Sequence, residues 1–585
     1  MSYKLRILSH NKTIEVKENE ILADTIQKAG INLSAYCNKR GLCGKCFVEI
    51  TQGMLPPLKE REKFLLRNKR LEQNCRLACL YKIKGDLSIE IPEESIIQET
   101  FILTTGIQTP IELNPAVKKY HFQLKKPAIL APYSLSEIFE FYFKDKNVII
   151  PLDLLKVLQE LLEKSKFNVT AVVYNDKEVL NVEQHRTLDK NYGIAVDLGT
   201  TTVVVELVDL NSGKSIDALT ATNSQMKYGS DVISRISFAV LEPKNLDQLR
   251  CSILKTLNQM IEQILDKNHI DCSYVYEIVI AGNTTMNHLL LGVPVKSLAR
   301  APFHSAFTQL SAQYSRYLGF KINNFGKVYI VPNIKSFVGG DISAGLIASN
   351  LPSRRGNYLF IDLGTNGEIV LKTEDKFVVT STAAGPAFEG MNISCGTLAF
   401  PGAIYKVEGK NRLDLFTIGN KSAIGICGTG LIDLISVFLE QGKIFSNGRI
   451  GNKRKKIHIT KNIYLTQKDI REVQLAIAAI KTGIKMILKK YQIRKEDLDG
   501  IFIAGAFGNY LNIKNAMKIG LLPQIIKEKI IFIGNSSLAG ARALLLSQPA
   551  REKMDALVKK INYLSLASDP LFQKNFLENL EFKTY

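Results

Sequence analysis

Residues 193–202 read GIAVDLGTTT, and residues 359–368 read LFIDLGTNGE. In each stretch an apolar run of strand length ends at an aspartate, and a glycine two residues later permits a tight turn. Asp197 and Asp362 occupy equivalent places in the two stretches. Strands and helices alternate from about residue 190 to 548, so the sequence predicts a duplicated α/β unit. Its two similar subdomains would face each other across a cleft.

The two turns have the composition of a clamp for nucleotide phosphates. Threonine hydroxyls and the backbone N–H groups of such a turn can donate to phosphate oxygens, and a strand-end aspartate can hold Mg²⁺ through water. Asp197 and Asp362 are therefore the predicted catalytic residues. The predicted nucleotide-binding residues of the turns are Gly199, Thr200, Thr201, Thr202, Gly364, Thr365, Asn366 and Gly367.

Two further glycine turns are expected at the same nucleotide. Gly428 and Gly430 open a helix, whose N-terminus favours anions. Gly505 and Gly508 follow a strand, as expected of an adenosine-binding turn. For either turn alone, tight backbone packing is the alternative. Two carboxylates, Asp341 and Glu389, are candidates for the cleft, and either could equally be structural.

A different kind of site occupies the first hundred residues. Cys37, Cys43 and Cys46 form a C-x5-C-x2-C pattern, and Cys79 follows. Thiolates at these intervals can wrap a loop around an iron–sulfur cluster. Zinc would require a better-matched second pair, and a thioredoxin-type dithiol would lie on a βα turn. The flanking residues resemble plant- and adrenodoxin-like 2Fe–2S ferredoxins. Cys75 is either a buried spare thiol, which the pattern favours, or an alternative ligand.

The predicted fold class is multi-domain α+β and α/β: a β-grasp ferredoxin, a small α+β middle domain and a duplicated C-terminal unit. The chain is too long for one core. The predicted segments are a ferredoxin-like domain (1–95), a linker (96–118), the middle domain (119–188), two subdomains (189–350 and 351–550) and a helical C-terminal tail (551–585).

Composition limits the classes of binding partner and the cellular compartment that can be expected. Apolar residues make up 46% of the chain and charged residues 23%, as in an ordinary soluble protein. The N-terminus lacks the apolar core of a signal peptide, and the apolar runs are too short to span a bilayer. A cytoplasmic protein without a membrane partner is expected. The net charge of +20 indicates first a lysine-rich, solvated surface, and an acidic partner is the alternative. No nucleic-acid-binding motif accompanies it, so nucleic acid is not expected.

The duplicated turns resemble those of the acetate kinase, sugar kinase, heat-shock protein and actin (ASKHA) superfamily, in which two facing hairpins hold ATP across a hinged cleft. The whole chain resembles the reductive activators of corrinoid proteins. That resemblance implies an ATP-hydrolysing homodimer that takes electrons from an external low-potential donor. It would pass one electron from a 2Fe–2S cluster to a corrinoid methyl carrier, converting cob(II)alamin to cob(I)alamin. The cofactors would be the cluster, ATP and Mg²⁺. Supporting stretches include CNKRGLCGKC (37–46), AGNTTMNHLLLG (281–292), FVGGDISAG (337–345) and AAGPAFEGMNISCG (383–396).

Two other functions stay open from the residues alone. One is a metabolite kinase with a fused regulatory ferredoxin. The other is an electron-transfer module on a nucleotide-binding platform that does not hydrolyse ATP. Within residues 281–292 we expect Asn283 or Thr284 to cap a helix, with His288 on its polar face. A contact of these residues with nucleotide or with the corrinoid partner is the alternative.

Overall fold

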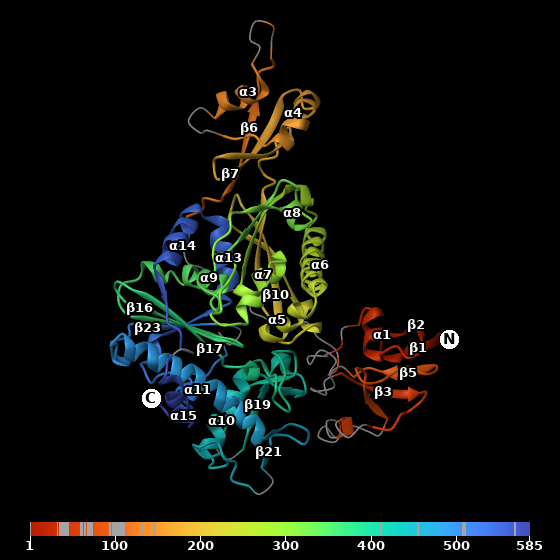
Figure 1. The fold of residues 1–585 in the computed structure, drawn as a ribbon, viewed down its shortest axis with the longest axis vertical. Helices are drawn as coiled ribbons and strands as arrows, with labels where there is room; N and C mark the ends of the chain where they lie inside the picture. The colour runs from red at the N-terminus through yellow and green to blue at the C-terminus, as the bar shows by residue number, and fades with distance from the viewer. Residues whose placement is uncertain are drawn as a thin grey trace.

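The structure is a computed structural model that describes residues 2–31, 33, 46–58, 62, 63, 66, 74–92, 95, 112–127, 129, 133–143, 148–409, 412–452, 455–505, 510–566 and 569–585. Figure 1 shows three parts: an N-terminal unit to one side, a middle domain at the top, and a large two-lobed body. None of the helices within the described ranges has the length and apolar character needed to cross a membrane.

The N-terminal unit is a five-stranded sheet in the order β2-β1-β5-β3-β4. β1 pairs antiparallel with β2 and parallel with β5, which brings the two ends of the unit together in one sheet. α1 packs its buried residues against this sheet. The arrangement confirms the predicted β-grasp ferredoxin fold. The elements are β1 (Ser2–Ile7), β2 (Lys12–Lys17), α1 (Leu22–Lys28), β3 (Phe47–Gln52), β4 (Cys75–Leu77) and β5 (Leu87–Glu90).

The middle domain is a three-stranded antiparallel sheet covered by two helices. Its hairpin turns at Asn175 and Asp176, both with positive φ, as its alternating flanks predict. One face of the sheet packs on the two helices, and the other contributes Val172 and Leu180 to the core beneath the first subdomain. The elements are β6 (Val117–Gln123), α3 (Leu135–Tyr142), α4 (Leu152–Lys164), β7 (Asn168–Tyr174) and β8 (Glu178–Gln184).

The C-terminal body contains two six-stranded sheets of the same design, ordered β11-β10-β9-β12-β14-β13 and β24-β23-β15-β16-β17-β25. In each, the strand ending in the predicted aspartate pairs antiparallel with the next strand and parallel with a later one. The predicted duplication is thus confirmed. The first sheet comprises β9 (Tyr192–Leu198), β10 (Thr202–Asp209), β11 (Ser215–Thr222), β12 (Val275–Gly282), β13 (Gln313–Tyr314) and β14 (Lys327–Ile330). The second comprises β15 (Tyr358–Leu363), β16 (Gly367–Lys372), β17 (Phe377–Thr382), β23 (Gly500–Ala504), β24 (Ile530–Gly534) and β25 (Ile561–Tyr563).

Two central helices cross between the sheets. α9 (Gly340–Ala348) follows the first sheet and places Ile342 and Leu346 in the core of the second, whereas α13 (Ser536–Leu546) follows the second sheet and packs on the first. They touch at glycines: a Cβ on Gly540 would lie 2.1 Å from the Ala344 carbonyl oxygen. This close approach is open only to glycine. The crossing places both helix N-termini beside the cleft.

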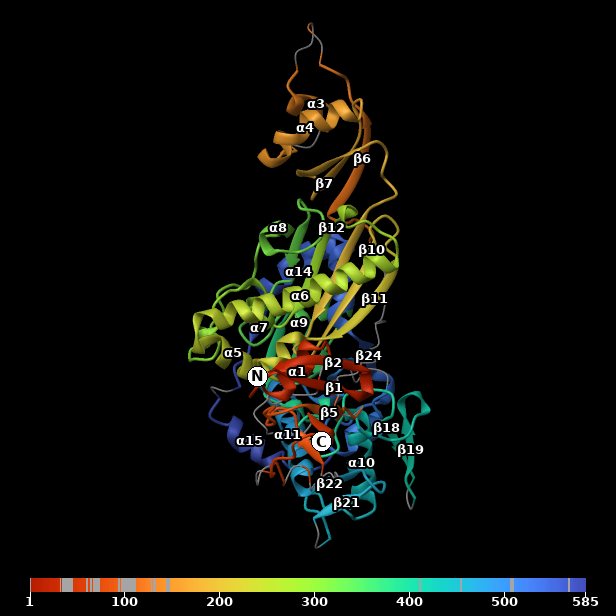
Figure 2. The ribbon, with the colours of Figure 1, turned by 90° about the vertical axis from the view of Figure 1, so that its right-hand side faces the viewer.

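Long helices cover the outer faces of the two sheets. Figure 2 shows α6 lying across β10 and β11. On the second sheet, α11 packs against β16 and β17. The covering helices are α5 (Val232–Leu241), α6 (Pro243–Lys267), α7 (Thr284–Leu291), α10 (Gly428–Glu440) and α11 (Gln467–Lys490). The C-terminal segment adds α14 (Gln548–Lys560) and α15 (Phe572–Glu578). It differs from the predicted helical tail because β25 pairs parallel with β17 and so extends the second sheet.

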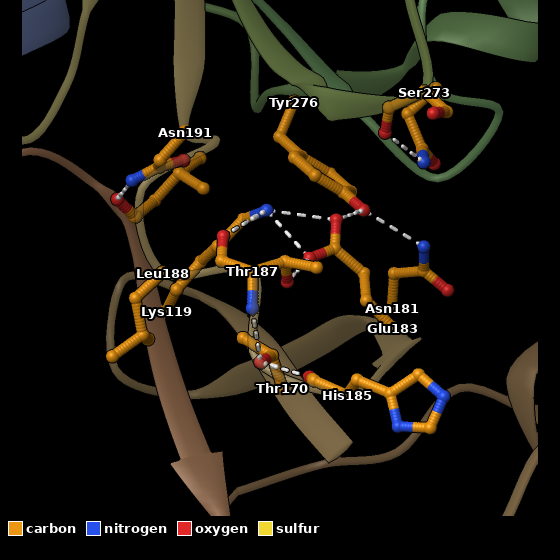
Figure 3. A network of polar contacts seen from close by, with 12 residues as sticks. Lys119, Thr170, Asn181, Glu183, His185, Thr187, Leu188, Asn191, Ser273 and Tyr276 are labelled. Carbon is orange, nitrogen blue, oxygen red and sulfur yellow. Dashed lines mark hydrogen bonds and ion pairs between the residues drawn. The ribbon is translucent and has the colours of Figure 1, made fainter. Parts of the chain in front are cut away.

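A buried polar network fastens the middle domain to the first sheet (Figure 3). The Lys119 ammonium group lies 2.6 Å from a carboxylate oxygen of Glu183, and these side chains are only 1% and 8% exposed. Tyr276, on β12, donates its hydroxyl to Glu183 at 2.6 Å and accepts from Asn181 at 2.9 Å. The Thr187 hydroxyl also donates to Glu183. Because these groups would be costly to separate, the middle domain should move with the first subdomain.

Candidate functional site

The two predicted phosphate turns meet at one carboxylate. Glu389, at the end of the short helix Pro386–Glu389, accepts a hydrogen bond from the Thr201 hydroxyl at 3.2 Å. Its other oxygen accepts from the Thr365 hydroxyl at 2.5 Å. Burial raises the pKa of Glu389. The structure thus brings together two segments far apart in sequence and gives the candidate Glu389 a definite place between them.

The first turn is held from several sides by polar side chains. Asn223 donates to the Gly199 carbonyl at 2.8 Å, and Asn283 donates to the Thr200 hydroxyl at 2.9 Å. The guanidinium of Arg235, which is fully buried, donates to the Thr200 carbonyl. A Cβ on Gly199 would lie 2.5 Å from the Thr202 carbonyl oxygen, so the turn requires glycine there. A fixed backbone of this kind is what a phosphate clamp needs.

Three aspartates from different elements share the cleft. Asp197 and Asp362 are the penultimate residues of β9 and β15, and Asp341 lies in the first turn of α9. Burial raises the pKa of each, and the charge of Asp197 adds to this at the other two. The pKa values of Asp341 and Asp362 both reach about 7. Such mutual repulsion is relieved by a bound cation.

The donor set fits Mg²⁺ held jointly with a nucleotide. Within the described ranges, no three acidic, histidine or cysteine side chains lie close enough to bind a metal unaided. Mg²⁺ characteristically keeps several waters and binds one or two carboxylates together with substrate phosphates. Asp197 is oriented for such a role, because Asn535 and Ser537 donate to its two oxygens at 2.9 and 2.8 Å.

The glycines of the two further predicted nucleotide-binding turns differ in their surroundings. Gly505 lies beside Asp362: its φ is +97°, and a Cβ there would lie 2.9 Å from an Asp362 carboxylate oxygen. Gly430 is explained by packing, because a Cβ would lie 2.2 Å from the Ile404 carbonyl oxygen. Gly428 is the first residue of α10, which contacts the short helix that carries Glu389. Gly508 lies outside the described residues.

The second turn is built like the first. The Gly364 amide donates to the Asn366 carbonyl at 3.2 Å, and the Gly385 amide donates to the Thr365 carbonyl at 2.9 Å. A Cβ on Gly367 would lie 2.9 Å from Ile480 of α11, so this glycine lets the helix approach the turn. Both turns therefore approach the carboxylate of Glu389, and their contact with nucleotide stays a prediction.

Two of the four predicted cluster ligands can be placed. The Ala78 amide donates to the Cys46 carbonyl at 2.9 Å, which brings the strand-start Cys46 next to the turn that carries Cys79. Cys75 lies opposite Glu49, at the end of β4 farther from Cys46. This register favours its interpretation as a buried spare thiol. Cys37 and Cys43 lie outside the described residues.

The capping prediction at residues 281–292 needs one correction. Asn283 caps α7 by accepting from the Met286 amide at 2.9 Å, as expected. His288, however, is completely buried rather than on a polar face. Its ring stacks on Phe307, and its Nε2 accepts from the Ala306 amide at 3.1 Å. Nδ1 therefore carries the proton and donates to the Thr284 carbonyl at 2.7 Å.

The burial of His288 predicts that the protein loses stability in mild acid. Burial lowers its folded-state pKa below the ordinary 6.5, so the unfolded chain takes up the proton first as the pH falls. The contribution of the neutral His288 ring to the free energy of unfolding is complete above pH 6.5. It declines as the pH falls from 6.5 to the folded-state pKa. Urea unfolding at pH 7.5 and 5.5 should show a smaller decrease in His288→Gln than in the wild type. His10→Gln, at a partly exposed histidine, is the control. An equal decrease in H288Q and the wild type would contradict the prediction.

Four residues that hold the site were not predicted from the sequence: Asn223 and Arg235 at the first turn, and Asn535 and Ser537 at Asp197. Asn535 and Ser537 hold Asp197, yet neither was a candidate. A signal existed in the residues GNSS at 534–537, which follow a strand as GNTT does at 282–285. Both asparagines cap the next helix: Asn535 accepts from the Leu538 amide at 3.0 Å, as Asn283 does from Met286. The repetition of this motif would have indicated a second cap at the cleft.

Fold and site together define the class of protein: an enzyme in which a 2Fe–2S ferredoxin domain is fused to an ASKHA-type ATPase domain. Family models agree along the chain. They match a 2Fe-2S iron-sulfur cluster binding domain (5–84), the RACo linker region (106–189), the RACo middle region (192–354) and the C-terminal ASKHA domain of RACo (356–585). The cofactors are a 2Fe–2S cluster, ATP and Mg²⁺, as predicted.

The chain belongs to the RACo family, the reductive activators of corrinoid proteins. It is 32% identical to the corrinoid activation enzyme RamQ of Eubacterium limosum over 97% of both chains. It is 29% identical to the [Co(II) methylated amine-specific corrinoid protein] reductase of Methanosarcina barkeri, covering 67% of this chain and 77% of that one. A solved reductive activator for corrinoid, iron-sulfur protein superposes with a TM-score of 0.75 at 33% identity, covering 100% of this chain and 98% of that chain.

Proposed function

We propose that this chain is an ATP-dependent reductive activator of a corrinoid methyl-carrier protein. One electron passes from the reduced 2Fe–2S cluster to the partner's cobalt, converting cob(II)alamin to cob(I)alamin, while ATP is hydrolysed to ADP and phosphate. An external low-potential donor returns the electron to the cluster. The proposal includes a homodimer. The activities of the relatives support the substrate class, and the fusion of the ferredoxin domain to the ASKHA domain supports the coupling.

The position of Glu389 is the observation that supports coupling between ATP hydrolysis and electron transfer. Its carboxylate holds Thr201 of the first turn and Thr365 of the second at once. A nucleotide between the turns would compete for these hydroxyls, and so its binding would alter the link between the two subdomains. Thr201 and Thr365 would then bind phosphate oxygens, and Asp197 and Asp362 would hold Mg²⁺ through water. Hydrolysis would reverse the change.

Energetics explain why ATP is needed. A plant-type cluster supplies a one-electron reductant near about −400 mV. Each 59 mV by which the cobalt couple lies below this value lowers the equilibrium constant tenfold. A lower cobalt potential makes the transfer unfavourable unless another process shifts the equilibrium. We infer that closure of the ATP cleft favours a complex with the corrinoid protein in which the cobalt is easier to reduce.

Anaerobic absorbance spectroscopy tests the function directly. The reduced protein is mixed with a corrinoid protein in the cob(II) state, with and without Mg-ATP, and cob(I) is followed. We expect cob(I) to form only with ATP. Cys79→Ser should abolish it, whereas Cys251→Ser, at an exposed cysteine of α6, should not. If cob(I) forms at the same rate without ATP, the proposed coupling of electron transfer to ATP hydrolysis is wrong. If no cob(I) forms with any partner and ATP is consumed with a small acceptor, the chain is instead a metabolite kinase.

A further inference from the structure

A basic pocket lies away from the ATP cleft, between α11 and the C-terminal segment. Lys481, Lys485 and Lys489 follow one another at intervals of four along α11, so they share one face of the helix. Lys583, from the C-terminal segment, lines the same cavity of about 400 Å³. Four ammonium groups there meet only two carboxylates, those of Glu578 and Glu581.

Two lysines of this basic pocket, Lys481 and Lys485, donate hydrogen bonds to neutral groups. Lys481 donates to the Lys583 carbonyl at 2.8 Å, and Lys485 donates to the Asn579 side-chain oxygen at 2.8 Å. The ion pairs found among the described residues include none of the four lysines. Burial and the charges of Lys485 and Lys583 lower the pKa of Lys481 to about 8. Glu581 and Glu578 offset part of the charge at Lys481 and Lys485, and a net positive charge remains in the pocket.

Of the four lysines, Lys485, Lys489 and Lys583 are exposed to solvent, and only Lys481 is buried. Like charges four residues apart on one face also destabilise a helix. A lysine that faced only water would also be mobile, yet Lys481 is 3% exposed. The walls are fixed, since Asn579 donates to the Thr482 hydroxyl at 3.1 Å and Gln474 donates to the Leu580 carbonyl at 2.8 Å. A pocket with a fixed wall, in which lysines outnumber carboxylates by four to two, suits an anion.

We propose that this basic pocket binds a small polyanion that carries phosphate groups. Ammonium groups act as point charges toward phosphate oxygens, and several are needed for a ligand with two or more charges. The volume lies within the range of small-molecule sites. The opposite side of α11 packs against Gly367 of the second turn through Ile480. The basic pocket is thus separate from the clamp but lies on the helix that supports it.

Titration calorimetry with inorganic pyrophosphate tests the proposal. The full-length protein is first saturated with a non-hydrolysable ATP analogue and Mg²⁺, so that the cleft is filled. We expect one further pyrophosphate site. Lys485→Gln combined with Lys489→Gln should weaken it by about tenfold or more, because two charge-assisted contacts are lost. The matched control is Lys468→Gln with Lys490→Gln, which removes the same charge from α11 outside the pocket.

Amine labelling gives a second measurement at the residues themselves. Pyrophosphate should protect Lys485 and Lys489 from acetylation, detected by mass spectrometry, and should leave Lys490 unprotected. The proposal fails if pyrophosphate does not bind once the cleft is filled, or if both double variants bind it as the wild type does. Citrate that competes as well as pyrophosphate would overturn the phosphate assignment. Because cob(I) formation is not measured, these outcomes are independent of the proposed function.

Discussion

Replacing Asp362 with asparagine will lower the kcat of ATP hydrolysis by roughly 10²–10³-fold, the effect typical of removing one electrostatic group from a phosphate-transfer site. Asp362 lies near the end of β15 against Gly505, and its oxygens face the charges of Asp341 and Asp197. An amide keeps the shape but removes the charge that would hold Mg²⁺. Phosphate release under saturating Mg-ATP measures the effect.

The stability of the same variant separates catalysis from folding. The raised pKa of Asp362 means that ionisation of this carboxyl opposes folding, with a cost that begins above the ordinary pKa of 3.8 and is complete above the folded-state pKa of about 7. Asp362→Asn should therefore unfold at the same temperature as the wild type or higher, although it is inactive. Asp497→Asn removes a carboxylate paired with Arg494 at the surface and should change neither quantity appreciably. A kcat for D362N within a few-fold of the wild type would show that Asp362 is not needed for hydrolysis.

Local sequence was sufficient to predict the strands, the turns and their duplication. Each turn is encoded within about ten consecutive residues, in which an apolar strand, an aspartate and a glycine occur in order. Two copies of such a segment imply two sheets that can face each other. The cysteine spacing likewise lies mostly within one loop. These features could be predicted because the residues that create them are neighbours in the chain.

Contacts between distant segments could not be predicted in the same way. Glu389 reaches Thr201 only because the two subdomains fold against each other. His288 is enclosed because residues 306 and 307 pack over α7, which the polar sequence around it does not reveal. β25 was predicted as helix because its neighbours on both sides are helical, and pairing with β17 decides its conformation. Tertiary packing overrides local preference at such places.

The junction in Figure 3 gives the second large effect, on stability rather than activity. Glu183→Gln will lower the free energy of unfolding by about 3–5 kcal/mol, since it leaves the Lys119 ammonium group buried without its counter-charge. Burial already lowers the pKa of Lys119 despite the adjacent carboxylate. The loss also weakens the bond to Tyr276, which anchors the middle domain to β12. Because the chain has several domains, hydrogen exchange of β8 and β12 should be followed alongside urea unfolding.

The neighbouring residue on the same strand supplies a matched control. Lys118 pairs with Asp176 at 2.8 Å, but both side chains are more than a quarter exposed. Asp176→Asn should therefore cost no more than about 1 kcal/mol. Equal losses in the two variants would mean that the Lys119–Glu183 pair is no stronger than a surface pair. If E183Q alone loosens β8 and β12, the middle domain is fixed to the first subdomain by this network. It would then be carried along whenever the ATP cleft opens or closes.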